Sequence, residues 1–231
     1  APRALAPVGA GGDAGGGAGG TAPEVPAWPE QVVVPAVSVV AGAAHVCALS
    51  EAGEVSCWGR NDVGQLGYGN TEAIGDDEAA GSAGSVDVGG AVVALTAGRR
   101  HTCAILQKGS IRCWGYGGDL ALGNGHGHFD TTGDDETPAE KGDAIVYSNS
   151  PFAELAAGDH HTCVRTTAGG VKCWGDSPAG ALGYGYVTST GGWLGNVPLT
   201  DTITSVVAGA EHTCAVVAGG LVRCWGDRAA I

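Results

Sequence analysis

The sequence predicts an all-β protein made of four repeated small antiparallel sheets. The stretch HTCAILQKGSIRCWG, which begins at His101, is typical of two short strands around a turn, and it recurs from His45, His161 and His212. The chain also contains 43 glycines and no methionine, which indicates many turns and little of the side-chain packing that is typical of a helical core. Long apolar periodicity of 3.6 residues is absent from the sequence, so a helical solenoid is disfavoured.

The central unit of each repeat is a hairpin with two cysteines ten residues apart. If Cys103 faces Cys113 in an antiparallel ladder, then Leu106 faces Ser110 and residues 107–109 form a three-residue loop. Such loops favour glycine at their third position, where the backbone is left-handed. The four copies place Gly53, Gly109, Gly169 and Gly220 at that position.

The hairpin register predicts four local disulfides, because facing residues have Cα atoms ~4.5 to 5.5 Å apart, a separation that a disulfide spans. The predicted pairs are Cys47–Cys57, Cys103–Cys113, Cys163–Cys173 and Cys214–Cys224. Persistent disulfides indicate an oxidising compartment, so we expect a secreted or cell-surface protein. Two alternatives are eight reduced, buried thiols, as in a cytosolic protein, and a metal site built from the His-x-Cys pattern.

Further strands flank each hairpin. An apolar run ending in Ala-Gly precedes it, as in AVVALTAG, and supplies a first strand. After the first three hairpins come GQLGYG, LALGNG and GALGYG, then a polar loop and a short extended segment that we interpret as an outer strand. Second cysteines recur at intervals of 51 to 60 residues, a period typical of propeller blades. The sequence therefore predicts a β-propeller-like array of four-stranded blades.

Histidine and tryptophan hold equivalent positions in all four repeats. A histidine opens each hairpin and a tryptophan follows each second cysteine. Four copies at one blade position favour packing between blades over ligand binding. The predicted packing residues are His45, His101, His161, His212, Trp58, Trp114, Trp174 and Trp225.

The repeat AGRRHTCAILQKGSIRCWG, followed by LALGNG, resembles the repeat of the regulator of chromosome condensation family. The resemblance covers roughly residues 36 to 231 and implies a β-propeller. The cysteine-rich form is similar to the exported bacterial branch of the family. Family propellers usually have seven blades, whereas this sequence shows four repeats, which leaves a small closed ring and an open arc as alternatives.

The sequence divides into an arm and a repeat domain. Residues 1–30 form an arm rich in glycine, alanine and proline, and residues 31–231 form the propeller domain. The expected repeats span about 36–90, 91–150, 151–202 and 203–231. The last repeat stops after its hairpin and is expected to lack an outer strand, whereas the stretch EQVVVPAV offers a spare extended segment.

This missing strand and this spare strand suggest self-assembly. The spare segment would fill the last blade of a neighbouring copy by strand addition, giving a head-to-tail homo-oligomer or filament. The expected assembly residues are Trp28, Gln31, Val32, Val33 and Val34. Closure within one molecule is an alternative, as is a closed monomeric surface propeller that binds a ligand through its loops.

The formal charge of −13 argues against nucleic acid as a partner, because phosphate binding relies on clustered Lys and Arg. No stretch approaches the roughly 20 apolar residues needed to span a bilayer, so membrane insertion is not expected. Nuclear members of the family act in guanine-nucleotide exchange and chromatin binding. The acidic charge, the missing blades and the paired cysteines disfavour that function here.

Catalytic motifs are missing from the sequence, which contains no nucleophile elbow, phosphate loop or His-Glu-x-x-His pattern. We therefore predict a protein that is not an enzyme and has no cofactor. Two acidic loops, IGDDE and TGDDE, raise the alternative of calcium binding at Asp76, Asp77, Glu78, Asp134, Asp135 and Glu136. Neither loop has the spacing of a dedicated calcium loop, which favours turn capping by these carboxylates.

Overall fold

The computed structural model describes residues 36–125, 130–186, 189–192, 195–227 and 229. Twelve strands form four antiparallel sheets, each with three strands in sequence order. The first two blades contain β1 (Ser38–Ala41), β2 (His45–Leu49), β3 (Val55–Gly59), β4 (Val92–Ala97), β5 (His101–Leu106) and β6 (Ile111–Gly115). The last two contain β7 (Phe152–Ala157), β8 (His161–Thr166), β9 (Val171–Gly175), β10 (Ile203–Ala208), β11 (His212–Val217) and β12 (Val222–Gly226). A four-residue helix, α1 (Pro138–Lys141), lies between β6 and β7.

The predicted hairpin register is confirmed. Cys103 faces Cys113, and the Leu106 amide donates to the Ser110 carbonyl at 2.9 Å, which closes the three-residue loop. Gly109 has a φ of 91°, the left-handed conformation that this loop requires. All four predicted disulfides form, each with a Cα–Cα distance of 4.1 Å, slightly shorter than expected from the ladder alone.

The predicted outer strand is wrong for the part of the chain that the structure describes, because each of the first three blades has three strands. Two short contacts replace the fourth strand, one at each end of the third strand. In the first blade, Gly59 pairs with Ile74 in an isolated bridge, and the Val86 amide donates to the Val55 carbonyl at 2.7 Å. Directly after the bridge, Gly75 adopts a φ of 93°, which turns the chain away and prevents a longer strand.

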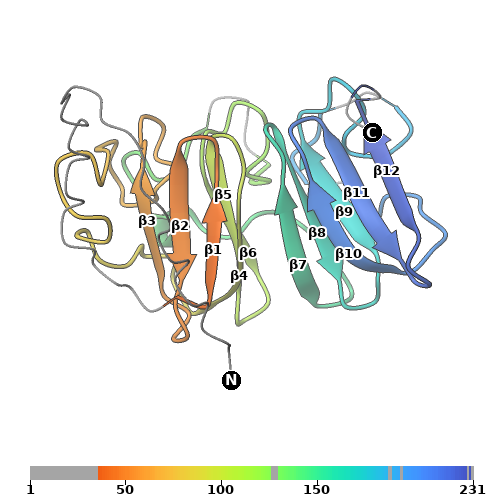
Figure 1. The fold of residues 1–231 in the computed structure, drawn as a ribbon, viewed down its shortest axis with the longest axis horizontal. Helices are drawn as coiled ribbons and strands as arrows, with labels where there is room; N and C mark the ends of the chain where they lie inside the picture. The colour runs from red at the N-terminus through yellow and green to blue at the C-terminus, as the bar shows by residue number, and fades with distance from the viewer. Residues whose placement is uncertain (1–35, 126–129, 187–188, 193–194, 228, 230–231) are drawn as a thin grey trace, which may run out of the picture.

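The four blades stand side by side in chain order, as Figure 1 shows. Adjacent first strands contact one another, β1 with β4, β4 with β7 and β7 with β10. The four Ala-Gly turns that follow these strands line one cavity of about 280 Å³. The first strands are therefore arranged about one axis, with the Ala-Gly turns at one mouth.

The described residues form three hydrophobic core clusters, one for each contact between adjacent blades. Each cluster contains cysteines of one blade and the tryptophan of the next, for example Cys47 and Cys57 with Trp114. Cys103 and Cys113 share a cluster with Trp174 in the same way. The core thus lies between adjacent blades. A blade that has no neighbour on one side therefore exposes the residues that would otherwise form its part of a cluster.

Candidate functional site

The seam between adjacent blades is a repeated hydrogen-bond relay. His101 Nε2 lies 2.9 Å from the hydroxyl of Thr162 in the next blade, and that hydroxyl donates to the Ala121 carbonyl of the first of these two blades. Because the hydroxyl proton is used in this way, the imidazole must be the donor, which fixes the Nε2–H tautomer. The same relay links His45 with Thr102 and His161 with Thr213, each at 2.9 Å.

Glycine lets the histidine approach the neighbouring blade. A Cβ placed on Gly98 would lie 2.2 Å from His101 Cε1 and 2.5 Å from the Gly158 carbonyl oxygen of the next blade. A real Cβ does not fit at such distances, so the Ala-Gly motif is explained by this close contact. Gly42 and Gly158 stand in the same relation to their own histidines and to the following blade.

Trp114, Trp174 and Trp225 lie at the seams, each against a glycine of the preceding blade, whereas Trp58 belongs to the first blade and no described blade precedes it. Trp174 is fully buried, and its indole N–H donates to the Ala121 carbonyl of the preceding blade at 2.8 Å. A Cβ on Gly123 would meet Trp174 Nε1 at 2.7 Å, which explains the glycine of the Leu-Gly motif. Trp114 is also fully buried, whereas Trp58 and Trp225 in the terminal blades are only partly buried.

The seam histidines are neutral at physiological pH. Burial lowers the pKa of His45 and of His161 to about 4. Burial, together with repulsion from neighbouring histidines, lowers the pKa of His101 to about 3. A neutral imidazole has one N–H donor, which is the form that the relay to threonine uses.

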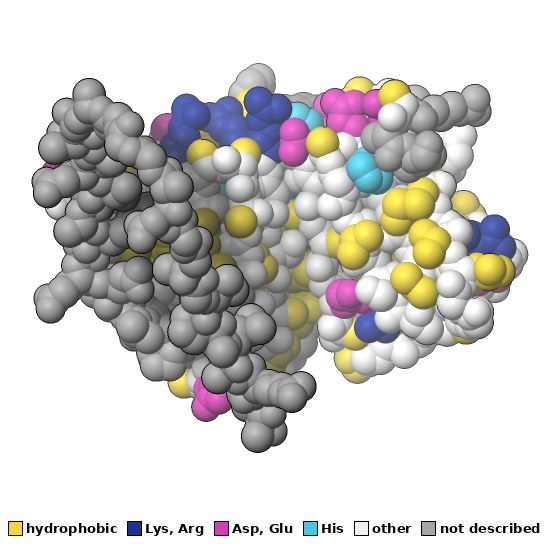
Figure 2. Space-filling view, in the orientation of Figure 1, with side chains coloured by type: hydrophobic (Ala, Val, Ile, Leu, Met, Phe, Trp, Pro, Cys, Tyr) yellow, Lys and Arg dark blue, Asp and Glu magenta, His cyan; other side chains and the backbone are white. Residues whose placement is uncertain are grey.

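The fourth blade has the same surface, and no blade within the described ranges covers it. The cysteines of the first three blades are at most 6% exposed, whereas Cys214 is partly buried and Cys224 is exposed. His212 is also partly exposed, and among the described residues none lies across from it as Thr213 lies across from His161. Figure 2 shows apolar side chains on the surface over this blade, whose exposed apolar residues are Val207, Leu221 and Val222.

The outer edge of the fourth blade also differs from the others. Gly59, Gly115 and Gly175 end the third strands of their blades, and each pairs with a residue of the following loop. Gly226 is the equivalent residue of β12, and it has no such bridge within the described residues. The fourth blade therefore offers both an uncovered side and a backbone edge that is available for pairing.

The first blade of a second copy would not cover this open side in the way that each internal blade covers the preceding one. Thr102, Thr162 and Thr213 are fully buried acceptors at the seams, but the equivalent position in the first blade is Val46. Val46 is only partly buried and has no hydroxyl group. Stacking the first blade of a copy on the fourth blade would therefore leave His212 without the acceptor that the other three histidines have.

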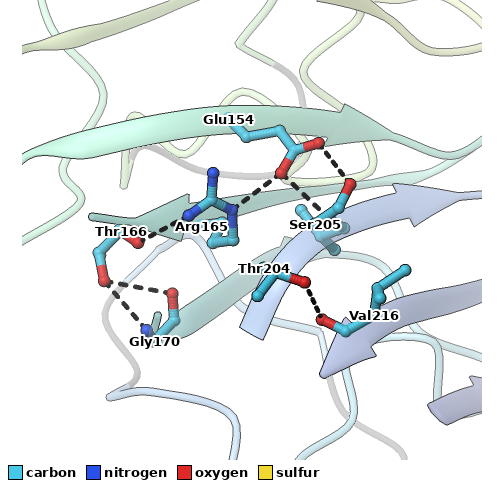
Figure 3. Close-up of polar contacts among 8 residues, drawn as sticks. Glu154, Arg165, Thr166, Gly170, Thr204, Ser205 and Val216 are labelled. Carbon is cyan, nitrogen blue, oxygen red and sulfur yellow. Dashed lines mark hydrogen bonds and ion pairs between the residues drawn. The ribbon is translucent and has the colours of Figure 1, made fainter. Parts of the chain in front are cut away.

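A carboxylate strengthens the seam between the third and fourth blades, as Figure 3 shows. Glu154 of β7 accepts from the Ser205 hydroxyl at 2.8 Å and from the Val206 amide at 3.2 Å, both in β10. Arg165 of its own blade donates to the same carboxylate at 2.9 Å. The equivalent residue of β4 is Ala94, so the repeat pattern of the sequence does not predict a polar contact at this position. The role of Glu154 follows from the structure.

The two acidic loops each bring three carboxylates together. The ligand atoms of Asp76, Asp77 and Glu78 lie within 4.8 Å of one another, as do those of Asp134, Asp135 and Glu136. In the first loop, Glu78 accepts from the Gly75 amide at 3.0 Å, as turn capping predicts. In the second loop, Lys141 lies 3.1 Å from Glu136 and supplies a positive charge within the protein.

The expected assembly residues Trp28, Gln31, Val32, Val33 and Val34 lie outside the described residues. Among the residues that are described, no helix has the length and apolar character that crossing a membrane requires.

Comparison with known proteins gives a family and a fold. The Regulator of chromosome condensation (RCC1) repeat matches residues 36–65, 92–119, 152–181 and 203–227. The ultraviolet-B receptor UVR8 of Arabidopsis thaliana is 33% identical over 212 residues, which make up 89% of this chain and 43% of the receptor. The chain thus spans less than half the length of this relative.

Solved structures show the same architecture at lower identity. Human WBSCR16 superposes with a TM-score of 0.65 and 20% identity, over 81% of this chain and 46% of that one. Prp20p from Saccharomyces cerevisiae, described with its binding to Gsp1p and histones, has a TM-score of 0.62 and 21% identity. That superposition covers 87% of this chain and 47% of Prp20p. The four blades therefore match an arc of a larger propeller.

Proposed function

Because this chain belongs to the regulator of chromosome condensation (RCC1) repeat family, we propose that it is a non-enzymatic binding protein that acts through contacts between proteins. The likeness to Prp20p, whose binding to another protein and to histones is described, supports a role for the scaffold in protein binding. The polar side chains at the blade seams serve the fold, since they are buried and hydrogen-bonded to neighbouring blades. Binding is therefore assigned to the surfaces that the blades leave open.

The binding surface is the open side of the fourth blade. The observation that carries this proposal is the exposure of Cys224, next to the partly exposed His212, on a surface that is buried in each of the other three blades. The exposed apolar side chains and the unpaired strand edge together favour a protein partner. A protein can cover the apolar side chains and can add a strand to the edge of the sheet.

The proposed partner is a second copy of the chain. Residues 31–34 would add as a strand beside β12, giving Gly226 the backbone partner that its three counterparts have within their own blades. Strand addition uses main-chain hydrogen bonds, so it does not depend on a hydroxyl at Val46. Repetition of this contact from copy to copy would give head-to-tail oligomers or filaments.

The proposed place of action is outside the cell or at its surface. Four disulfides support an oxidising compartment, since reduced thiols are the rule in the cytosol. Three of the disulfides are buried at seams, where they fix the register of their hairpins.

Light scattering after size-exclusion chromatography tests the self-association, with the full chain compared with a chain that lacks residues 1–35. We expect oligomers whose size grows with concentration for the full chain and monomers for the shortened one. Val33→Pro removes a backbone donor from the arm and should also give monomers, whereas the matched variant Val33→Thr should still associate.

Two results would overturn this assignment. A full chain that is monomeric at every concentration, and that loses thermal stability without the arm, would place the strand within its own molecule. Oligomers that persist after removal of the arm would locate the contact elsewhere on the propeller.

A second candidate function is ligand binding by the loops of a monomer. A polar cavity of about 570 Å³ beside the β8–β9 turn favours it, because ligand sites in proteins are concavities of this size. Its lining includes Thr166, Gly170, Lys172, Asn196 and Thr200.

A further inference from the structure

The residue before the second cysteine of each blade allows the blades to be compared with one another. In the second blade it is Arg112, whose Nε donates to Asp143 at 2.9 Å and whose Nη1 donates to the Val88 carbonyl at 2.7 Å. In the fourth blade it is Arg223, which pairs with Asp201. A cation at this position is therefore matched by a carboxylate in both blades.

The third blade breaks this pattern. Its cation is Lys172, and the residue equivalent to Asp143 is Asn196. The equivalence follows from the backbone, since the Ala144 amide donates to the Ile111 carbonyl at 2.8 Å and the Val197 amide donates to the Val171 carbonyl at 2.7 Å. The third blade thus has the amide of Asn196 where the second blade has the carboxylate of Asp143. The ammonium group of Lys172 therefore has no counter-ion at this position.

Lys172 has no ion pair or hydrogen bond within the described part of the chain. Its side chain is partly buried, and burial lowers the pKa of its ammonium group. A bound anion would supply the counter-charge that Lys172 lacks within the protein.

The cation lines the cavity of about 570 Å³. The cavity lies between three segments: the loop before β7, the β8–β9 turn and the loop before β10. Its hydrogen-bonding groups include Asn149, Asn196 and Thr200, and the ring of Tyr147 is 75% exposed. The lining also contains the carboxylate of Asp201, whose charge is matched by Arg223. Figure 3 shows the Thr166 hydroxyl accepting from the Gly170 amide, which holds the turn that forms one wall.

We propose that this cavity binds an acidic saccharide, with the sugar carboxylate on Lys172. A lysine provides a single compact charge, which pairs with one anionic group such as a sugar carboxylate. The amide side chains of Asn149 and Asn196 offer both donors and acceptors to sugar hydroxyls. The exposed ring of Tyr147 offers an apolar face to the C–H groups of a sugar ring.

The site is independent of self-association, because none of its residues belongs to the arm or to β12. A chain that lacks residues 1–35 retains the whole cavity. It therefore tests saccharide binding separately from self-association, so the failure of one proposal can be told from the failure of the other.

Calorimetric titration of the full chain with galacturonate tests the proposal, with galactose as the neutral probe and inorganic phosphate as the simple anion. We expect galacturonate to bind at least tenfold more tightly than either. Asn196→Asp restores the carboxylate of the second blade with almost no change in shape, so it should weaken galacturonate binding at least tenfold. Lys172→Gln should do the same.

Gln107→Glu is the matched control, because it adds the same negative charge in an exposed turn of another blade. It should leave galacturonate binding unchanged. Equal binding of galactose and galacturonate, equal binding of phosphate, or an unchanged affinity in Asn196→Asp would each overturn the proposal.

Discussion

His161 Nε2 lies 2.9 Å from the Thr213 hydroxyl across the seam between the third and fourth blades, and both residues are buried. The same pair of side chains recurs at the two earlier seams. The pair joins the blades through neutral groups, so its strength depends on complete pairing of donors and acceptors rather than on charge.

Removal of one threonine hydroxyl should destabilise a seam. Thr162→Val leaves the His101 N–H without an acceptor, whereas the Ala121 carbonyl still accepts from Trp174. A buried unpaired donor costs about 1–3 kcal/mol. The free energy of unfolding, measured in urea, should fall by that amount. The reverse change at the equivalent position of the first blade, Val46→Thr, should alter stability by less than about 0.5 kcal/mol, because Val46 is partly exposed. Equal effects of the two variants would contradict the role of the relay.

Acidification should destabilise the fold between about pH 6.5 and pH 4. In that range the unfolded chain binds protons at histidines that the folded chain keeps neutral, so the free energy of unfolding falls as the pH falls. A pKa lowered from 6.5 to about 4, as for His45 and His161, corresponds to about 3 kcal/mol for each residue below pH 4. Urea midpoints at pH 7, 5.5 and 4.5 should decrease in this order.

A substitution separates the histidines from other titrating groups. His101→Gln should show a shallower dependence of the urea midpoint on pH, because one group with a lowered pKa has been removed. Asp62 and Asp143 have pKa values below their ordinary value, so their carboxylates stay ionised in the folded chain and reduce its stability only at the acid end of this range, where the unfolded carboxylates begin to bind protons. A variant with the pH dependence of the wild type would contradict this assignment.

The fourth disulfide should be reduced first. Cys224 is exposed, whereas the cysteines of the first three blades are at most 6% exposed, so a mild reductant reaches only the last pair in the native state. Brief reduction followed by alkylation and peptide mapping should label Cys214 and Cys224. Uniform labelling of all eight cysteines would show that the fourth blade is as well covered as the others.

Loss of the Glu154 carboxylate should loosen the fourth blade. Glu154→Ala removes the acceptor for the Ser205 hydroxyl and the Val206 amide. Hydrogen exchange at the Val206 amide should become faster, with an opening free energy lower by about 1–3 kcal/mol. Exchange in β4 and β5 should stay as in the wild type, and a uniform increase across all four blades would instead indicate global destabilisation.

The repeat itself could be predicted because its interactions are local. Cys103 and Cys113 are ten residues apart, and the loop glycine at 109 fixes which residues face each other. The outer strand was predicted wrongly because an extended segment does not reveal how long it stays beside its neighbour. Gly75, with a φ of 93°, ends the pairing after one bridge.

The sequence by itself determined four hairpins, their register, their disulfides and the family, since each depends on residues close together in the chain. Only the tertiary structure decided that His161 meets Thr213, that the described part of the chain leaves one side of the fourth blade uncovered and that Lys172 and Asn196 line one cavity. The seam contacts join residues 52 to 61 positions apart. At such separations the packing of one blade on the next selects the partner, and no local spacing rule specifies it.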